Sequence, residues 1–249
     1  MPNEVPRVAS LKFPVENLLA MEDAREIPAY NIALAAQYLH LPTSTLRDWV
    51  QGGVYRVAAG TKRFAPLINL PNPKVQLLSF YNLAEAHVLS ALRRVHNVKM
   101  PAIRKALDYV TERFHWERPL IQQEFKVAGA SLFVERLDHV FVDAGTSGKQ
   151  VMLDFIREYM TRLEWEDKLA VKFYPFTRKE FSNSPKLILI DARLSFGRPV
   201  IISNRVPTAI IAERYKAGDS TKHLARDYAC PIEEIEEAVR CELNSQLAA

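Results

Sequence analysis

The chain has 249 residues, 48% hydrophobic and 25% charged, with a formal net charge of +4, which is ordinary for a globular protein. No apolar run approaches the roughly 18 residues that indicate a membrane span. The two cysteines, Cys230 and Cys241, exclude a disulfide framework and have no zinc-site spacing. Because prolines and polar residues interrupt the first segment, "MPNEVPRVASLKFPVEN", we expect no signal peptide, no membrane association and a cytoplasmic protein.

The charge is unevenly distributed along the chain. Residues 43–118 contain twelve Lys or Arg against five acids, a net charge of +7. Residues 227–249 contain six acids and one Arg, a net charge of −5. A basic front segment favours contact with phosphates, whereas an acidic tail opposes it.

The front segment predicts two short helices separated by a turn. "NIALAAQYLHL" places Ile32, Ala35 and Leu39 at helical spacing. Pro42 then disfavours helix at the residue before it, and Thr43 can cap a second helix over residues 43–51. That helix carries Leu46, Trp49 and Val50 on one face, as in a helix-turn-helix, or as in two helices that simply pack.

A hairpin and two longer helices are expected next. "VYRVAAGTKRFAPLINL" predicts a small hairpin that turns at Gly60 and Thr61, with Lys62 and Arg63 beside its tip. "LAEAHVLSALRRVHN" and "MPAIRKALDYVTERF" each keep apolar residues on one helical face. This order, over roughly residues 30–114, resembles the winged helix-turn-helix of the MerR type. We therefore assign residues 1–118 to a DNA-binding domain.

The middle segment, residues 119–195, predicts an α+β connector. "SLFVERLDHVFVDAGTSGKQVML" has apolar runs around a glycine-containing hairpin turn, and "DFIREYMTRLEWE" looks helical. "LAVKFYPF" and "KLILIDARLSF" look like strands. Within this segment, "LEWED" is expected to be a solvated turn. "AGTSGKQ" lacks the glycine and the Ser or Thr of a phosphate-binding loop.

The last segment, residues 196–249, predicts a three-helix unit. "VPTAIIAERYKAG" places Ile210, Ile211 and Tyr215 on one face, Ser220 can cap the next helix, and Pro231 begins the third. We expect the acidic helix that follows, 231–242, to be a solvated face or a partner-binding surface. The overall fold class is thus mainly α with small β elements (α+β).

"IDARLSFGRPVIISNRVPTAIIAERYKAGDSTKHLARDYACPIEEIEEAV" is similar to a small bacterial domain associated with antitoxins of type II toxin–antitoxin pairs. Ser203 and Asn204 stand where that domain usually has Gly and Thr. Together with the MerR-like front, most of the chain resembles VapB-type antitoxins. The resemblance implies a DNA-binding antitoxin that neutralises a PIN-like ribonuclease toxin and represses the shared operon. A MerR-like transcription regulator without a toxin partner is the alternative.

The residues expected to contact operator DNA lie in the second helix and the hairpin: Thr43, Ser44, Thr45, Arg47, Lys62 and Arg63. A homodimer or larger toxin–antitoxin assembly is expected, because one short helix contacts too few base pairs for specificity. The six histidines have no metal-ligand spacing and no catalytic arrangement is present, so we expect no enzyme, metal or cofactor.

A toxin contact is expected in the segment that carries Arg193, Arg198 and Arg205. The resemblance implies a toxin with an acidic active site, and guanidinium groups suit clustered carboxylates. The alternative is that these arginines hold the segment against its own domain.

Overall fold

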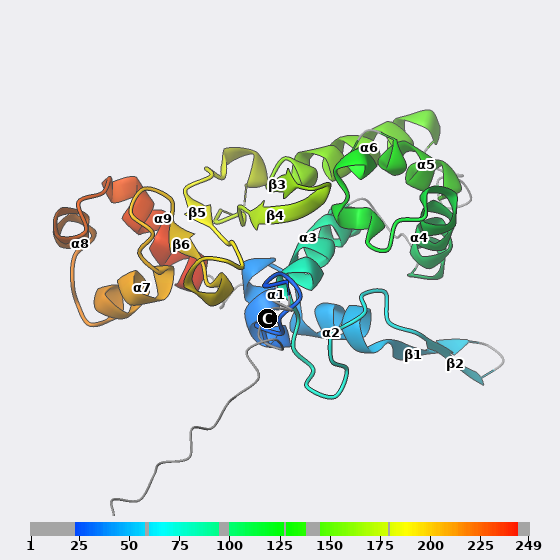
Figure 1. Cartoon of the computed structure of the whole chain (residues 1–249), viewed down its shortest axis with the longest axis horizontal. Helices are drawn as coiled ribbons and strands as arrows, with labels where there is room; N and C mark the ends of the chain where they lie inside the picture. The colour runs from blue at the N-terminus through cyan, green and yellow to red at the C-terminus, as the bar shows by residue number, and fades with distance from the viewer. Residues whose placement is uncertain are drawn as a thin grey trace, which may run out of the picture.

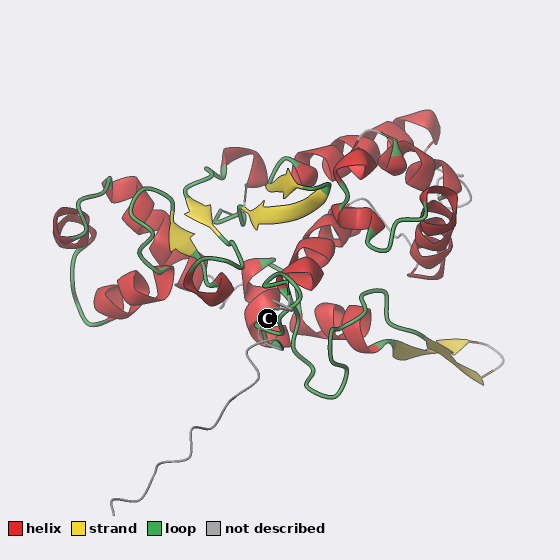
Figure 2. Cartoon of the chain, viewed as in Figure 1, coloured by secondary structure: helices red, strands yellow, loops and turns green. Residues whose placement is uncertain are grey.

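The computed structural model describes residues 23–57, 60–94, 100–126, 128–137, 145–178 and 180–243. The described ranges are mainly helical, and their strands form three antiparallel pairs (Figure 2). The expected class, mainly α with small β elements, is confirmed. No helix in these ranges combines the length and the apolar character needed to cross a membrane.

The front of the molecule follows the predicted order of elements. It contains helices α1 (Ile32–Tyr38) and α2 (Thr43–Gln51), strands β1 (Gly53–Val57) and β2 (Gly60–Phe64), and helices α3 (Phe80–Arg94) and α4 (Met100–Phe114). Figure 1 shows β1 and β2 extending away from the body as a two-stranded ribbon that follows α2. The turn predicted at Gly60 and Thr61 is wrong, because both residues pair in β2.

The middle segment contains more helix than the sequence predicts. Its elements are short 3-10 helices Pro119–Ile121, Gln123–Lys126 and Phe181–Asn183, helices α5 (Gly129–Arg136) and α6 (Gly145–Met160), and strands β3 (Leu163–Glu166) and β4 (Leu169–Phe173). The predicted strand in "LAVKFYPF" is confirmed by β4. The sequence gives two different predictions for residues 163–167: a helix that continues through "LEWE", or a solvated turn at "LEWED". The structure instead pairs Leu163–Glu166 with β4, and the turn is at Asp167 and Lys168.

The hairpin turn predicted for "GTSGKQ" is wrong, because Gly145 begins α6. The reason lies in the residues that follow. Met152, Ile156 and Tyr159 recur at helical spacing and are buried, so their packing favours helix despite the two glycines. The residues between α5 and α6, 138–144, lie outside the described ranges.

The C-terminal part is the expected three-helix unit, joined to a small strand pair. It contains β5 (Ile188–Leu189), the 3-10 helix Ser195–Gly197, β6 (Val200–Ile201), α7 (Thr208–Lys216), α8 (Thr221–Asp227) and α9 (Ile232–Leu243). Ser220 caps α8 as predicted, since its hydroxyl accepts from the amide of His223. The expected face of α7 is wrong in part. Ile211 is buried with Ala212, whereas Ile210 and Tyr215 are exposed.

The main hydrophobic core runs through the molecule, from Tyr30 in the front to Cys241 in α9, and a second, small cluster contains Tyr174, Leu189 and Val200. Helix α3 lies at the centre of the main core, and every residue from Phe80 to Ala91 is buried. Helix α3 packs against α6, and α4 packs against α5. These contacts cross the boundary expected after residue 118. The domain boundaries at 118 and 195 stay predictions.

The chain that follows β4 is held by one buried guanidinium group. Arg162 donates to the carbonyls of Tyr174, Pro175, Ser184 and Pro185 at 2.9–3.1 Å. Burial lowers the pKa of Arg162 to about 10, so the group stays charged at neutral pH. Its charge is balanced by these carbonyl dipoles, which anchor the segment next to β4.

Candidate nucleic-acid interface

One face of helix α2 is buried against the rest of the fold, and the opposite face is exposed. Leu46, Trp49 and Val50 are buried. The exposed side carries Ser44, Arg47, Asp48 and Gln51, which are spaced three or four residues apart. These four side chains therefore form one polar face, and the expected contact residues Ser44 and Arg47 both belong to it.

The start of α2 differs by one residue from the prediction. Pro42, not Thr43, occupies the capping position, and its carbonyl accepts from the amides of Thr45 and Leu46. Proline fixes the extended backbone needed before the first turn, so Thr43 is already helical. Thr43 and Thr45 are partly buried. Of the three hydroxyl residues proposed for DNA contact, Ser44 is the most accessible.

The β1–β2 ribbon places Lys62 and Arg63, two of its three basic residues, at different pairs of the ladder. Arg63 pairs with Val54, next to the first residue pair of the ladder, Gly53 with Phe64. Its side chain is exposed. Lys62 pairs with Tyr55. The prediction that both residues lie beside the tip is therefore wrong for Arg63. The tip itself, residues 58 and 59, and the side chain of Lys62 lie outside the described part.

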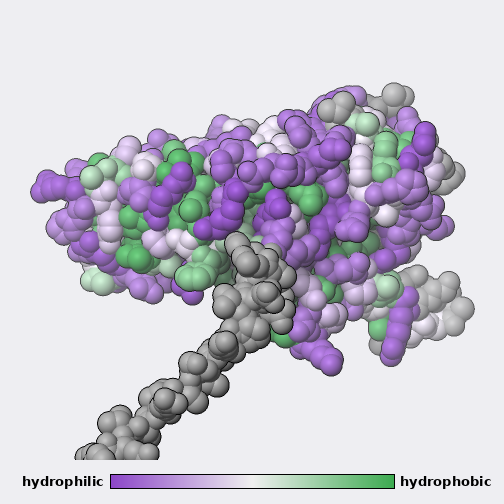
Figure 3. Space-filling view, viewed as in Figure 1, coloured by the Kyte–Doolittle hydropathy of each residue, from purple (hydrophilic) through white to green (hydrophobic). Residues whose placement is uncertain are grey.

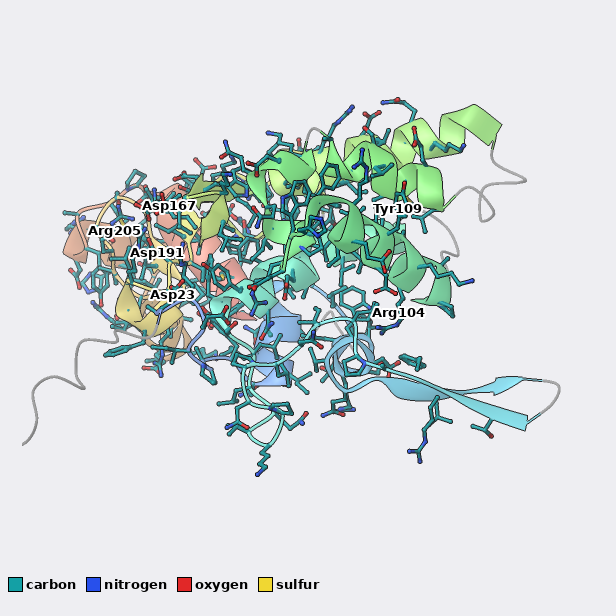
Figure 4. All side chains as sticks on the ribbon, turned by 45° about the vertical axis from the view of Figure 1, so that its right-hand side comes forward. Asp23, Arg104, Tyr109, Asp167, Asp191 and Arg205 are labelled. Carbon is teal, nitrogen blue, oxygen red and sulfur yellow. The ribbon has the colours of Figure 1, made fainter. Side chains whose placement is uncertain are left out.

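The ribbon is anchored at its base from both sides. Gly52 links α2 to β1 with a φ of +72°, and a Cβ there would lie 2.4 Å from the carbonyl oxygen of Phe64. On the other side, Arg104 of α4 donates to the carbonyls of Ala65 and Pro66, the latter at 2.7 Å. Figure 4 shows Arg104 on α4, next to the chain that leaves the ribbon. The direction of the ribbon relative to α2 is thus set by α4.

The loop after the ribbon returns along α2. The amides of Leu67 and Ile68 donate to the carbonyl of Trp49, and Gln51 donates to the side chain of Gln76 at 2.7 Å. This loop also carries the exposed Lys74. Gln51 and Lys74 were missing from the expected contact set. Helical spacing from Arg47 could have indicated Gln51, whereas the position of Lys74 depends on a loop path that the sequence does not define.

The three arginines expected to contact a toxin differ in their surroundings. Arg193 donates to Asp191 at 3.2 Å and to Glu166 at 2.7 Å, as the alternative of a segment held by its own domain predicts. Arg205 is exposed and has a φ of +62°. Arg198 is exposed and lines a cavity of about 470 Å³ between the front and C-terminal elements.

The expectation that helix 231–242 is a solvated face is wrong for two of its acids. Glu234 and Glu237 are buried. Glu237 pairs with Arg178 and Arg240, both at 2.5 Å, and accepts from Thr177, and Glu234 accepts from Ser203. The position of Asn204 is also structural, since its side chain bonds to Tyr228 and Val206. Part of the negative charge of the tail is therefore neutralised within the fold.

Within the described ranges, no three His, Cys, Asp or Glu residues lie close enough together to hold a metal ion. The arrangement combines a polar helix face, a ribbon whose strands carry basic residues, and an exposed lysine on the adjacent loop. Such surfaces contact nucleic acid through phosphates and base edges.

Residues 28–107 match a family described as "Putative DNA-binding HTH domain". This match covers α1 to the middle of α4, including the helix face and the ribbon described above. Residues 188–240 match a second family, described as a protein of unknown function (DUF433). The front of the chain is thus similar to a helix-turn-helix of a DNA-binding family, whereas its likeness to the MerR type stays a prediction.

A curated sequence and a solved structure, both from Mycobacterium tuberculosis, are similar to most of the chain. The "Putative antitoxin VapB45" is 27% identical over 229 residues, which are 86% of this chain and 93% of that protein. The X-ray crystal structure of Rv2018 matches with a TM-score of 0.60 and 22% identity, over 86% of this chain and 98% of that one. The second comparison supports the fold alone.

Proposed function

We propose that the chain is a DNA-binding antitoxin that represses its own operon and neutralises a PIN-like ribonuclease toxin encoded beside it. The observation that carries the DNA half is the exposed face of α2 next to the β1–β2 ribbon, in the segment similar to a DNA-binding family. The toxin half is supported by the similarity to VapB45 over 86% of the chain. The chain acts by binding, not as an enzyme.

In this proposal, α2 enters the major groove of operator DNA. Arg47 and Ser44 contact base edges, and Thr43 and Thr45 contact the adjacent backbone. Lys62 and Arg63 of the ribbon contact phosphates. Because α2 is short, two copies are needed to contact two half-sites, so the binding species is a homodimer.

The DNA half is tested with gel-shift titrations on the DNA upstream of the gene, at several salt concentrations. Arg47→Ala should cost about 1–3 kcal/mol of binding free energy and relax sequence preference. Arg63→Ala should weaken binding to all sequences and lower the salt slope by about one. Arg226→Ala in α8 is the control, because Arg226 is equally exposed but lies in the C-terminal unit. Unchanged operator binding by an Arg47/Arg63 double variant would remove α2 and the ribbon from the interface.

The toxin contact is proposed for the middle and C-terminal segments, because DNA occupies the front. Arg193 is paired with Asp191 and Glu166, so the proposal rests on Arg205. Arg205 is exposed, and its guanidinium group can bind acidic residues of a ribonuclease.

Co-expression of the neighbouring gene product tests this half. Arg205→Asn removes the charge and keeps a residue that tolerates the left-handed backbone, so it should reduce the rescue of growth from the toxin. Arg193→Lys is the control, because it keeps a charge in a contact that we assign to the fold. Full rescue by Arg205→Asn would discard Arg205. If operator binding holds and the neighbouring gene encodes no toxin, the alternative, a stand-alone MerR-like regulator, replaces the proposal.

A further inference from the structure

A fully exposed aromatic side chain projects from a backbone turn that the fold holds in place. Ser195, Phe196 and Gly197 have φ values of +48°, +56° and +76°, and Phe196 is 91% exposed. Left-handed backbone at residues other than glycine is strained and persists only where neighbours enforce it. Here Tyr30 donates to the carbonyl of Gly197 at 2.7 Å, and a Cβ on Gly197 would lie 2.4 Å from that hydroxyl. The exposure of Phe196 is therefore built into the fold.

A cavity of about 470 Å³ opens beside this turn, and Phe196 forms part of its rim. One wall comes from the front of the chain and contains Ile27, Leu34 and Phe80, and the other contains Pro199 and Ala209. Ile27 is itself 45% exposed. Figure 3 shows hydrophobic residues among the hydrophilic ones over the C-terminal elements. An apolar knob and an apolar hollow thus lie side by side on one surface.

The same cavity is lined by two opposite charges, Arg198 and Glu242. Glu242 accepts from the hydroxyl of Thr208 at 2.5 Å, which orients its carboxylate. Arg198 is exposed, and no ion pair with a carboxylate holds it in the described part of the chain. A surface that carries one charge of each sign is electrostatically self-complementary when it meets a copy of itself about a two-fold axis.

We propose that this surface is the interface of a two-fold homodimer, in which Phe196 of each copy enters the cavity of the other. Arg198 of each copy then pairs with Glu242 of its partner. A two-fold interface uses the same patch on both copies, so it requires a knob and a hollow on one patch, together with complementary charges. The inference rests on the proposed function in one respect, because it assigns an interface to the homodimer that this function requires. In this arrangement Arg198 belongs to the dimer, and a toxin contact falls to Arg205.

The mass of the full-length protein in solution, measured by sedimentation velocity over a concentration series, tests the proposal. Wild type should be a dimer. Phe196→Asp should raise the dimer dissociation constant by about 30-fold or more, because a central aromatic anchor is replaced by a charge. Val151→Asp is the matched control, since Val151 is an exposed apolar residue on α6, away from the cavity. It should leave the dimer unchanged.

A charge-reversal pair separates pairing between copies from contacts within one copy. Arg198→Glu alone and Glu242→Arg alone should each weaken the homodimer, because like charges then meet twice. An equimolar mixture of the two variants should form heterodimers, because each copy then presents the charge that the other lacks. Contacts within one chain cannot produce this recovery.

Three outcomes would overturn the proposal. These are a monomeric wild type, a dimer that survives Phe196→Asp, and a mixture of the charge variants that stays monomeric. A monomer in which 8-anilinonaphthalene-1-sulfonate binds at the cavity would assign the cavity to a small apolar anion instead. Gel shifts on the same variants keep the two proposals apart. Failure of the dimeric wild type to bind operator DNA refutes the proposed function, whereas operator binding by a monomer refutes the interface and the expected homodimer but not DNA binding.

Discussion

His87 should make the stability of the fold fall with acidification. The residue lies in α3 and is 1% exposed, with its ring against Tyr159 at 4.9 Å and Phe173 at 4.5 Å between centroids. Its Nε2 lies 2.9 Å from the carbonyl oxygen of Tyr159, and because a carbonyl only accepts, Nε2 carries the proton of a neutral ring. Burial lowers the pKa of His87 to about 3, and the nearby positive charge of Arg162 acts in the same direction.

The sign and size of the effect follow from proton binding in the two states. An unfolded histidine has a pKa of about 6.5, so below that pH the unfolded chain binds a proton that the folded chain does not. The stabilising contribution is complete above about pH 6.5 and is lost as the pH falls toward 3. Between pH 7 and pH 5 the loss is about 2 kcal/mol, since one pKa unit corresponds to about 1.4 kcal/mol. This is a large share of a typical free energy of unfolding of about 5–15 kcal/mol.

Urea unfolding followed by circular dichroism at pH 7 and pH 5 measures this difference for wild type and for His87→Phe. The variant loses the donor to Tyr159 and is less stable at both pH values, but its stability should fall by about 2 kcal/mol less on acidification. His115→Asn is the control, because His115 is an exposed residue with left-handed backbone. Equal pH dependence in wild type and His87→Phe would refute the argument that burial keeps this ring neutral.

Two further predictions concern side chains with defined partners. Arg104→Ala removes the donor that holds Ala65 and Pro66, so we expect faster amide hydrogen exchange in β2 and weaker binding to all DNA sequences alike. Unchanged exchange over residues 60–64 would contradict the role of α4 in anchoring the ribbon. Glu237→Gln breaks the ion pairs of a carboxylate that is 0% exposed. It should lower the free energy of unfolding by about 2 kcal/mol, a value reduced from that of a fully buried pair because both arginine partners are partly solvated. Glu233→Gln, at an exposed position of the same helix, should change it far less, and equal losses in urea titrations would argue against the buried network.

Local signals in the sequence predicted the elements that local chemistry determines. The bounds of α2 follow from Pro42 before it and from Leu46, Trp49 and Val50 on one face. The cap of α8 follows from Ser220. The candidate DNA-contact face could be located for the same reason, because helical spacing alone places Ser44 and Arg47 on one side. Whether these residues contact DNA stays a prediction.

The features that the sequence did not predict depend on partners far along the chain. The periodicity of α3 indicates one apolar face, but its polar residues are buried as well. Asn82 bonds to Asn69, and Glu85 bonds to Arg118. Glu237 can be buried because it pairs with Arg178, which lies 59 positions away in the sequence. The cavity beside Phe196 is likewise made of two segments that no local pattern connects.

The burial of α3 on all sides determines where the chain can be cut. A fragment that ends after Arg118 would keep the guanidinium contacts to Glu26 and Glu85 but would uncover the side of α3 that packs against α6 and β4. That side includes His87, whose ring packs against Tyr159 of α6 and Phe173 of β4, and its exposure would invite aggregation instead of giving a separate DNA-binding module. Limited proteolysis of the folded protein should therefore spare the joint at 118, and DNA-binding experiments are best made on the intact chain with single substitutions.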